Sequence, residues 1–290
     1  SGSGFGGLFG KFSKSFKTQP SGTSKTSSPP IRTSQDLSLA LKRTSALDNY
    51  DKSSRLEAVE RIKQTPPALF SIEKITSFIE PLLRDPDNDC RRAGFELMTL
   101  CIEHDVNSYR QIYYSYIVQY WFLEGLDLQI TALQKMTNNG TNALDLFETN
   151  HRLPLLINEW LREVSRLVVE KPIIPYSNKL YPLLDFTNAL IEHNSRLFRK
   201  SDILGLLKEI IPICKKTFLD QDVLNCSEIF HSLIKYAFLP MEKLTEVVEM
   251  LCLSYNNGND TLKEQCWDIL VTASKSNISN NIFISLCKLL

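Results

Sequence analysis

The sequence lacks the features of secreted, membrane-spanning and nucleic-acid-binding proteins. No apolar run approaches the roughly 18–20 residues of a membrane-spanning helix, and no charged start followed by an unbroken apolar stretch marks a secretion signal. The 33 basic residues balance the 33 acidic ones, so no whole-molecule field attracts nucleic acid. We therefore expect a soluble, cytoplasmic protein without a nucleic-acid partner.

The sequence also has little that supports catalysis or holds a metal. Its seven cysteines include no Cys-x-x-Cys pair, and its four histidines lie far apart, outside every zinc-ligand spacing. The glycine cluster within residues 2–10 follows no strand and does not end in the Lys-Ser/Thr of a phosphate-binding loop. We expect no catalytic, cofactor-binding or metal-binding residue, no small-molecule substrate, and reduced cysteines that pack as small core residues.

Residues 1–33 are rich in Gly, Ser, Thr and Pro, and no acidic residue precedes Asp36. Such a segment buries too little surface to offset its ordering entropy, so we expect a disordered basic tail. Two interpretations of its aromatic and basic residues stay open, because five glycines in the first ten residues oppose the helix that would align them. The segment is either a plain flexible tail, or a basic amphipathic element that docks on a membrane surface or a partner through Phe5, Phe9, Lys11, Phe12, Lys14, Phe16 and Lys17.

Residues 34–290 form the predicted folded domain, and we expect it to be all-helical. Apolar residues recur there every three or four positions, without sustained two-residue alternation. Pro81, Pro182 and Pro212 fall inside such stretches, which predicts kinked or split helices. The expected helices lie near 36–48, 54–64, 71–84, 88–104, 108–122, 126–137, 153–169, 177–193, from Ser201, 222–237, from Pro240, 260–275 and from Ser279.

The spacing of the last helices predicts the architecture. The first helices of successive pairs are expected to begin near Ser201, Pro240 and Ser279, which are 39 residues apart. Helix pairs at this period are typical of HEAT repeats, in which each pair hides its apolar face against the next. The predicted fold is a HEAT-like α-solenoid of stacked antiparallel helix pairs.

One predicted helix carries more large aromatic residues than a single buried stripe accommodates, among them Tyr109 and Tyr114. Either these rings pack between repeats, or some of them face outward and bind a partner, because Tyr and Trp dominate binding hot spots. Only Arg110 lies nearby, which argues against stacking on single-stranded nucleic acid. Trp267 likewise stays open between core and surface. The candidate partner-binding residues are Tyr113, Tyr116, Tyr120 and Trp121.

An ordered set of segments resembles the amino-terminal HEAT-repeat domain of the tuberin family, the larger subunits of tuberous sclerosis complexes. The similarity covers most of residues 36–290, whereas the Gly-rich start and residues 256–259 depart from the family pattern. The segments are Leu133 through Gly140 (LQKMTNNG), Trp160 after Leu155-Leu156, Leu239-Pro240 with Glu242 and Leu244, Cys266-Trp267 with Leu270, and Ile282 with Leu286-Cys287.

The resemblance implies a non-catalytic part of a subunit that activates the small GTPase Rheb through a distant carboxy-terminal domain. It implies that this part binds a hamartin-like coiled-coil protein and so assembles a cytoplasmic complex that restrains TORC1 signalling, peripheral on lysosomal or vacuolar membranes. We expect a fragment, since the chain lacks an initiator Met and stops at Lys288-Leu289-Leu290 inside an apolar-periodic stretch. The alternatives are a HEAT adaptor in nuclear transport or membrane-coat assembly, anchored to lipid by its tail, or an unrecognised enzyme.

Overall fold

The structure is a computed structural model that describes residues 28–44, 51–142, 152–171, 174–217 and 219–289. Within these ranges the secondary structure is α-helical, with short 3-10 turns and no strand, which confirms the all-α prediction. The first half contains α1 (Ser34–Thr44), α2 (Lys52–Lys63), α3 (Ile72–Leu83), α4 (Asn88–His104), α5 (Val106–Tyr120) and α6 (Leu126–Met136). The second half contains α8 (Arg152–Glu170), α9 (Ile174–Asn194), α10 (Lys200–Lys216), α11 (Asp220–Tyr236), α12 (Met241–Asn257), α13 (Asp260–Ser274) and α14 (Ser279–Leu289).

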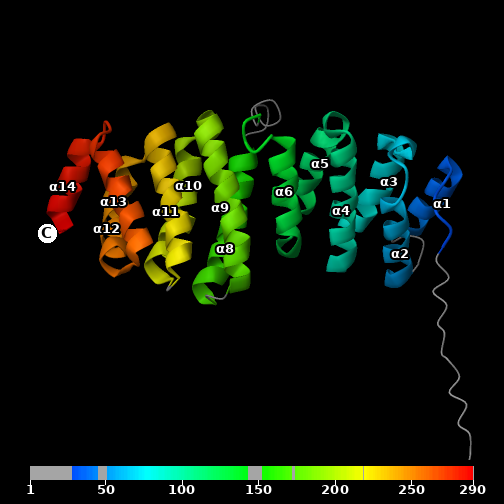
Figure 1. The fold of residues 1–290 in the computed structure, drawn as a ribbon, viewed down its shortest axis with the longest axis horizontal. Helices are drawn as coiled ribbons and strands as arrows, with labels where there is room; N and C mark the ends of the chain where they lie inside the picture. The colour runs from blue at the N-terminus through cyan, green and yellow to red at the C-terminus, as the bar shows by residue number, and fades with distance from the viewer. Residues whose placement is uncertain (1–27, 45–50, 143–151, 172–173, 218, 290) are drawn as a thin grey trace, which may run out of the picture.

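The helices stack into an elongated body of two layers. In one layer, α2, α4, α6, α9, α11 and α13 each pack on the next; in the other, α1, α3 and α5 form one run and α8, α10, α12 and α14 form a second. Figure 1 shows the resulting row, from α1 in blue at one end to α14 in red at the other. This arrangement confirms the predicted α-solenoid, because each pair buries its apolar face only against its neighbours.

Helix starts follow the local capping residues. Asp51, Ser71, Asp87 and Asp105 each precede a helix and accept a hydrogen bond from a backbone N–H of its first turn. Pro81, Pro182 and Pro212 lie inside α3, α9 and α10, as predicted.

The predicted period agrees with the structure, but two predicted caps were wrong. α10, α12 and α14 begin at Lys200, Met241 and Ser279, so their starts lie 41 and 38 residues apart, on either side of the expected 39. Residue Arg199, rather than Ser201, directly precedes α10. Asn259, rather than Asp260, caps α13, because its Oδ1 accepts a hydrogen bond from the Leu262 N–H at 2.9 Å.

A left-handed turn joins the two halves. Asn138, Asn139 and Gly140 have φ values of 48°, 57° and 87°, which end α6 at the predicted break. A Cβ on Gly140 would lie 3.1 Å from the Ala189 carbonyl carbon of α9, so a side chain would be crowded there as well as strained. The Asn194 side chain donates to the Gly140 carbonyl, which fixes this turn against the end of α9.

A continuous hydrophobic core runs through both halves. Its largest fully buried side chains come from α4, α5, α8, α9 and α11, and the buried cysteines of α10, α11 and α13 lie within it. The core therefore occupies the space between the layers, and any binding surface must lie on the outer faces or along the edges formed by the turns.

Candidate docking groove

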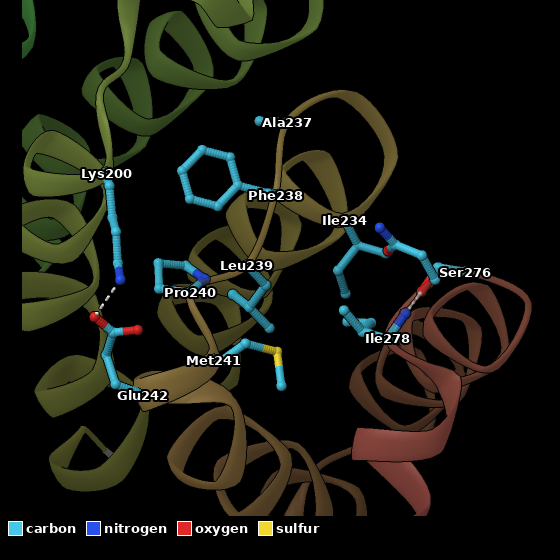
Figure 2. Close-up of a pocket in the computed structure, with 11 residues that line it drawn as sticks. Lys200, Ile234, Ala237, Phe238, Leu239, Pro240, Met241, Glu242, Ser276 and Ile278 are labelled. Carbon is cyan, nitrogen blue, oxygen red and sulfur yellow. Dashed lines mark hydrogen bonds and ion pairs between the residues drawn. The ribbon is translucent and has the colours of Figure 1, made fainter.

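The candidate site is a groove at the edge where α9, α11 and α13 end and α10, α12 and α14 begin. The turns after α9, α11 and α13 lie on this edge, and the groove, of about 330 Å³, is lined by the turns after α11 and α13 and by the first residue of α10. Figure 2 shows its lining, which consists of Lys200, Ile234, Ala237, Phe238, Leu239, Pro240, Met241, Glu242, Ser276, Asn277 and Ile278.

The turn between α11 and α12 supplies the apolar part of the groove. Pro240 lacks a backbone N–H and fixes its own φ, so it suits the position directly before the first turn of α12. Leu239 is buried in the core, whereas Phe238 and Met241 on either side of the Leu239-Pro240 pair keep 44% and 50% of their surface exposed. The chain thus anchors this turn through one pair of residues and presents two large apolar side chains to the outside.

Paired polar groups border the apolar part. The Lys200 Nζ atom lies 2.9 Å from Glu242 Oε1, and this contact links the first turns of α10 and α12. The hydrogen bond from Lys200 lowers the pKa of Glu242 below its usual value, so the carboxylate is charged at neutral pH. Near Ile278, Ser276 Oγ accepts from the Ile278 N–H at 3.3 Å and donates to the Ala273 carbonyl at 2.7 Å. Figure 2 shows the Lys200–Glu242 ion pair and the Ser276–Ile278 hydrogen bond on opposite sides of Met241.

The groove is suited to binding rather than to chemistry. Its charged groups neutralise each other, and its remaining surface is dominated by aliphatic, aromatic and thioether side chains. In the part of the chain that the structure describes, no three His, Cys, Asp or Glu side chains converge as metal ligands. No helix there is long and apolar enough to cross a membrane. The groove therefore offers a ligand an apolar surface that is bordered by the Lys200–Glu242 ion pair.

A second cavity, of about 610 Å³, lies between the amino-terminal turns of α9 and α11. It is lined by polar groups such as Ser177 and Asp222, and the Ser177 hydroxyl donates to Asp222 Oδ2 at 3.1 Å. Burial raises the pKa of Asp222, because the charged carboxylate loses its water. The exposed ring of Tyr181 and Leu219 also line this cavity, so it offers apolar contact beside these bonded polar groups.

The structure separates the four aromatic residues predicted to bind a partner. Tyr113 is fully buried and Tyr116 nearly so, which means that their rings fill the core between repeats and are not accessible from outside. Tyr120 and Trp121 are partly exposed; the Tyr120 hydroxyl bonds to Arg84 and Glu80, and Trp121 meets Trp160 edge-on. Tyr113 and Tyr116 therefore pack in the core, as the packing interpretation expects, and partner binding through the four aromatic residues stays a prediction.

The remaining predicted site residues fall in the tail. Phe5, Phe9, Lys11, Phe12, Lys14, Phe16 and Lys17 lie outside the described residues, so membrane docking stays a prediction.

Sequence reasoning missed Phe238 and Met241. A signal was present, because Phe238 stands in a short connection between two amphipathic helices, where a polar residue is typical, directly before a Leu-Pro pair. Periodicity assigns apolar residues to helix faces and does not evaluate apolar residues in turns.

Comparison with known proteins places these features in context. The model of a protein family described as "Domain of unknown function (DUF3384)" matches residues 52–290. A solved structure described as that of the TSC2 N-terminus superposes with a TM-score of 0.72 at 20% sequence identity, over 87% of this chain and 63% of that one. No curated protein matches. At this identity the likeness shows a shared fold, in agreement with the resemblance to tuberin's amino-terminal domain, and the chain spans less than two thirds of the TSC2 segment.

Proposed function

The chain belongs to the DUF3384 family, and from this premise we propose that it is a non-catalytic scaffold that binds a helical partner protein. By its likeness to the TSC2 N-terminus, the scaffold is the amino-terminal part of a tuberin-like subunit. Its partner is then a hamartin-like coiled-coil protein, and the complex that they form restrains TORC1 signalling. The proposed role in complex assembly goes beyond the family membership and the shared fold, which are its starting points.

The groove beside the α11–α12 turn is the observation that supports this proposal. Amphipathic helices bind proteins by placing apolar anchors in hydrophobic grooves. A monomeric surface rarely leaves large apolar side chains together in a concavity, and such patches mark interaction sites. Phe238 and Met241 share this concavity and are both about half exposed. Completing their burial would contribute roughly 1 kcal/mol each, about half the value for full burial of such side chains.

The experiment is to measure the affinity of the full chain for the hamartin-like coiled-coil partner. The double variant Phe238→Ser/Met241→Ser removes both anchors, and we expect about 30-fold weaker binding, which corresponds to roughly 2 kcal/mol. Leu39→Ser is the matched control, because Leu39 is an equally exposed apolar residue on α1, at the far end of the solenoid. The control variant should bind like the wild type.

Two results would overturn the proposal. One is a wild-type chain that forms no complex with the coiled-coil partner at micromolar concentrations. The other is a rate increase in GTP hydrolysis by a small GTPase on adding this chain alone, since a scaffold without catalytic groups leaves that rate unchanged. Circular dichroism of each variant shows whether a loss of binding reflects a loss of fold.

A further inference from the structure

We infer that the segment that occupies the groove is an acidic amphipathic helix, with apolar anchors on one face and Asp or Glu residues along its flanks. This inference rests on the proposed scaffold function and specifies the chemistry of the partner. It is drawn from the charges on the turns that border the groove.

Exposed basic side chains surround the groove on all three turns. They are Arg196 and Arg199 between α9 and α10, Lys200 at the start of α10, Lys235 at the end of α11, and Lys275 after α13. Only Lys200 makes an ion pair there, with Glu242. In the part of the chain that the structure describes, Arg196, Arg199, Lys235 and Lys275 have no acidic side chain within ion-pair distance. We call these four residues the basic rim.

The acidic residues on the same edge are already engaged. Glu242 pairs with Lys200, and Glu192, near the end of α9, accepts a hydrogen bond from the Tyr236 hydroxyl at 3.3 Å. The nearby Asp202 is buried and caps α10, since its Oδ2 accepts from the Arg199 backbone N–H at 2.8 Å. Neither Glu192 nor Asp202 lies within ion-pair distance of the basic rim, and the four cations of the rim outnumber these two carboxylates.

The charge of this edge is local, because the chain as a whole is neutral. The opposite edge of the same repeats carries charge of both signs: Asp220 and Asp260 lie on the turns that begin α11 and α13, and Lys216 is exposed at the end of α10. Exposed charges act over about 8–10 Å at physiological salt, so the basic rim acts on a ligand in the groove and not on the far edge. A bound segment with acidic flanks therefore meets mainly basic side chains at the groove edge and mixed charge at the opposite edge.

The dimensions of the edge fit a helix of limited length. Packed helices lie about 8–10 Å apart, so the three turns that border the groove extend over roughly 16–20 Å. A helix rises 1.5 Å per residue, which makes this span about 11–13 residues long. Anchors at positions i, i+3 or i+4 and i+7 of such a helix would contact Phe238 and Met241, and its flanking carboxylates would reach the basic rim.

A concave site favours this occupant over an anionic membrane. Apolar membrane anchors project beyond their surroundings to enter the lipid, whereas Met241 lines a hollow, with Lys200 and Glu242 on one side and Ser276 and Ile278 on the other (Figure 2). Membrane binding through the same basic residues is an outcome that the experiment distinguishes.

The experiment reverses the charge of the basic rim in the full chain. It measures affinity for the hamartin-like coiled-coil protein at low and at high salt, and binding to phosphatidylserine vesicles without that protein. Arg199→Glu/Lys235→Glu is the test variant. Lys208→Glu/Lys216→Glu is its matched control, because it changes the net charge equally at exposed positions of α10 away from this edge. We expect at least tenfold weaker binding for the test variant at low salt, a difference that shrinks as salt rises, and less than a twofold change for the control.

The possible outcomes separate the inference from the proposed function. If Phe238→Ser/Met241→Ser weakens binding and the basic-rim variant does not, the acidic helix is refuted and the scaffold function stands. If the wild-type chain forms no complex with the coiled-coil protein, so that the variants cannot weaken binding, the proposed function fails. If the basic-rim variant loses binding only to phosphatidylserine vesicles and keeps the protein partner, the edge binds membrane and the inference is wrong.

Discussion

The two halves of the solenoid share one architecture but differ in what covers their surfaces. In the first half, ion pairs join successive repeats: Lys52 contacts Asp89 at 2.6 Å, Lys63 contacts Glu96 at 2.5 Å, and Arg92 contacts Asp127 at 2.9 Å. Among the described residues of the second half, three ion pairs join repeats, and two of them are long, with both Arg162–Glu209 and Lys215–Glu246 at 3.6 Å.

Exposed apolar residues show the reverse distribution. Among the described residues, Leu39 is the large apolar side chain that the first half exposes. The second half exposes Leu155, Tyr181, Tyr236, Phe238, Met241, Leu253, Tyr255, Trp267, Phe283 and Ile284. Surface ion pairs contribute little stability individually, but they cover a surface with polar groups and leave no apolar patch to bind. The first half therefore presents a surface covered by ion pairs, whereas the second half presents exposed apolar side chains.

The largest expected effect tests whether the tyrosines of the first half are structural. Tyr113→Ala should cost about 3–5 kcal/mol of unfolding free energy, because it leaves a cavity in a close-packed core. It also removes a hydroxyl that donates to the Phe95 carbonyl at 3.2 Å. Denaturant unfolding measures the loss, and Tyr255→Ala, on the exposed surface of α12, is the control. Equal stability of the two variants would show that the halves do not differ in this way.

The next effect concerns the buried ion pair of the first half. Arg55 lies 3.2 Å from Asp85, whose side chain is 1% exposed, so Arg55→Met leaves a buried carboxylate without its cation. We expect a loss of about 3 kcal/mol. Lys135→Met, which breaks the exposed contact with Glu103, should cost less than about 1 kcal/mol. Adding Asp85→Asn to Arg55→Met should restore part of the loss, and thermal unfolding without that recovery would contradict the electrostatic explanation.

Much of this fold was predictable from the sequence. Apolar periodicity identified every helix that the structure describes, because each helix must bury a stripe against its neighbours. Asp260 was misplaced as a cap because Asn259 stands directly before it, and only the backbone geometry decides which side chain reaches an N–H group. Ser201 was misplaced because α10 begins after Arg199, and Asp202 accepts a hydrogen bond from the Arg199 N–H instead. The period of 39 was close because the turn lengths vary by only a residue or two.

The site was less predictable, since it depends on which faces the neighbouring repeats cover. Tyr113 and Phe238 are both large aromatic residues, but one lies where adjacent helices close over it and the other lies in a turn at the edge. Composition and helical spacing do not distinguish these positions. The basic rim is also invisible in the sequence, because its residues come from three turns about 40 residues apart.

A smaller expected effect is a difference between the halves in how their stability depends on pH. Burial lowers the pKa of His231 below 6.5, Lys235 lowers it further and Asp268 opposes them; the ring also bonds to Thr272 of α13 at 3.1 Å. The unfolded chain therefore binds a proton first as the pH falls, so this stabilisation is complete above about pH 6.5 and is lost as the pH falls through the lowered pKa. In the first half, the hydrogen bond from Arg92 lowers the pKa of Asp127 below 3.8, so its contribution is lost only under more acidic conditions.

The measurement is thermal unfolding at about pH 7 and pH 5, the range in which histidine titrates. His231→Gln keeps a hydrogen-bonding side chain without the titration, so it should reduce the loss of stability between these two conditions. Asp127→Asn should leave that loss unchanged. The opposite pattern would place the acid sensitivity in the first half.

The smallest effect concerns Trp267, which sequence reasoning left open and the structure leaves 58% exposed on α13. We expect Trp267→Ala to cost about 0.5–1 kcal/mol, mainly from the ring contact with Tyr255 at a centroid distance of 6.4 Å. The equivalent position in α11, 40 residues earlier, is Ser227, which is fully buried in the helix that α13 packs against. A partner that covers Trp267 would raise the cost toward the 3–5 kcal/mol of a core aromatic. A denaturant series on this chain, alone and with the coiled-coil partner, decides whether the exposed surface of the second half is free or covered.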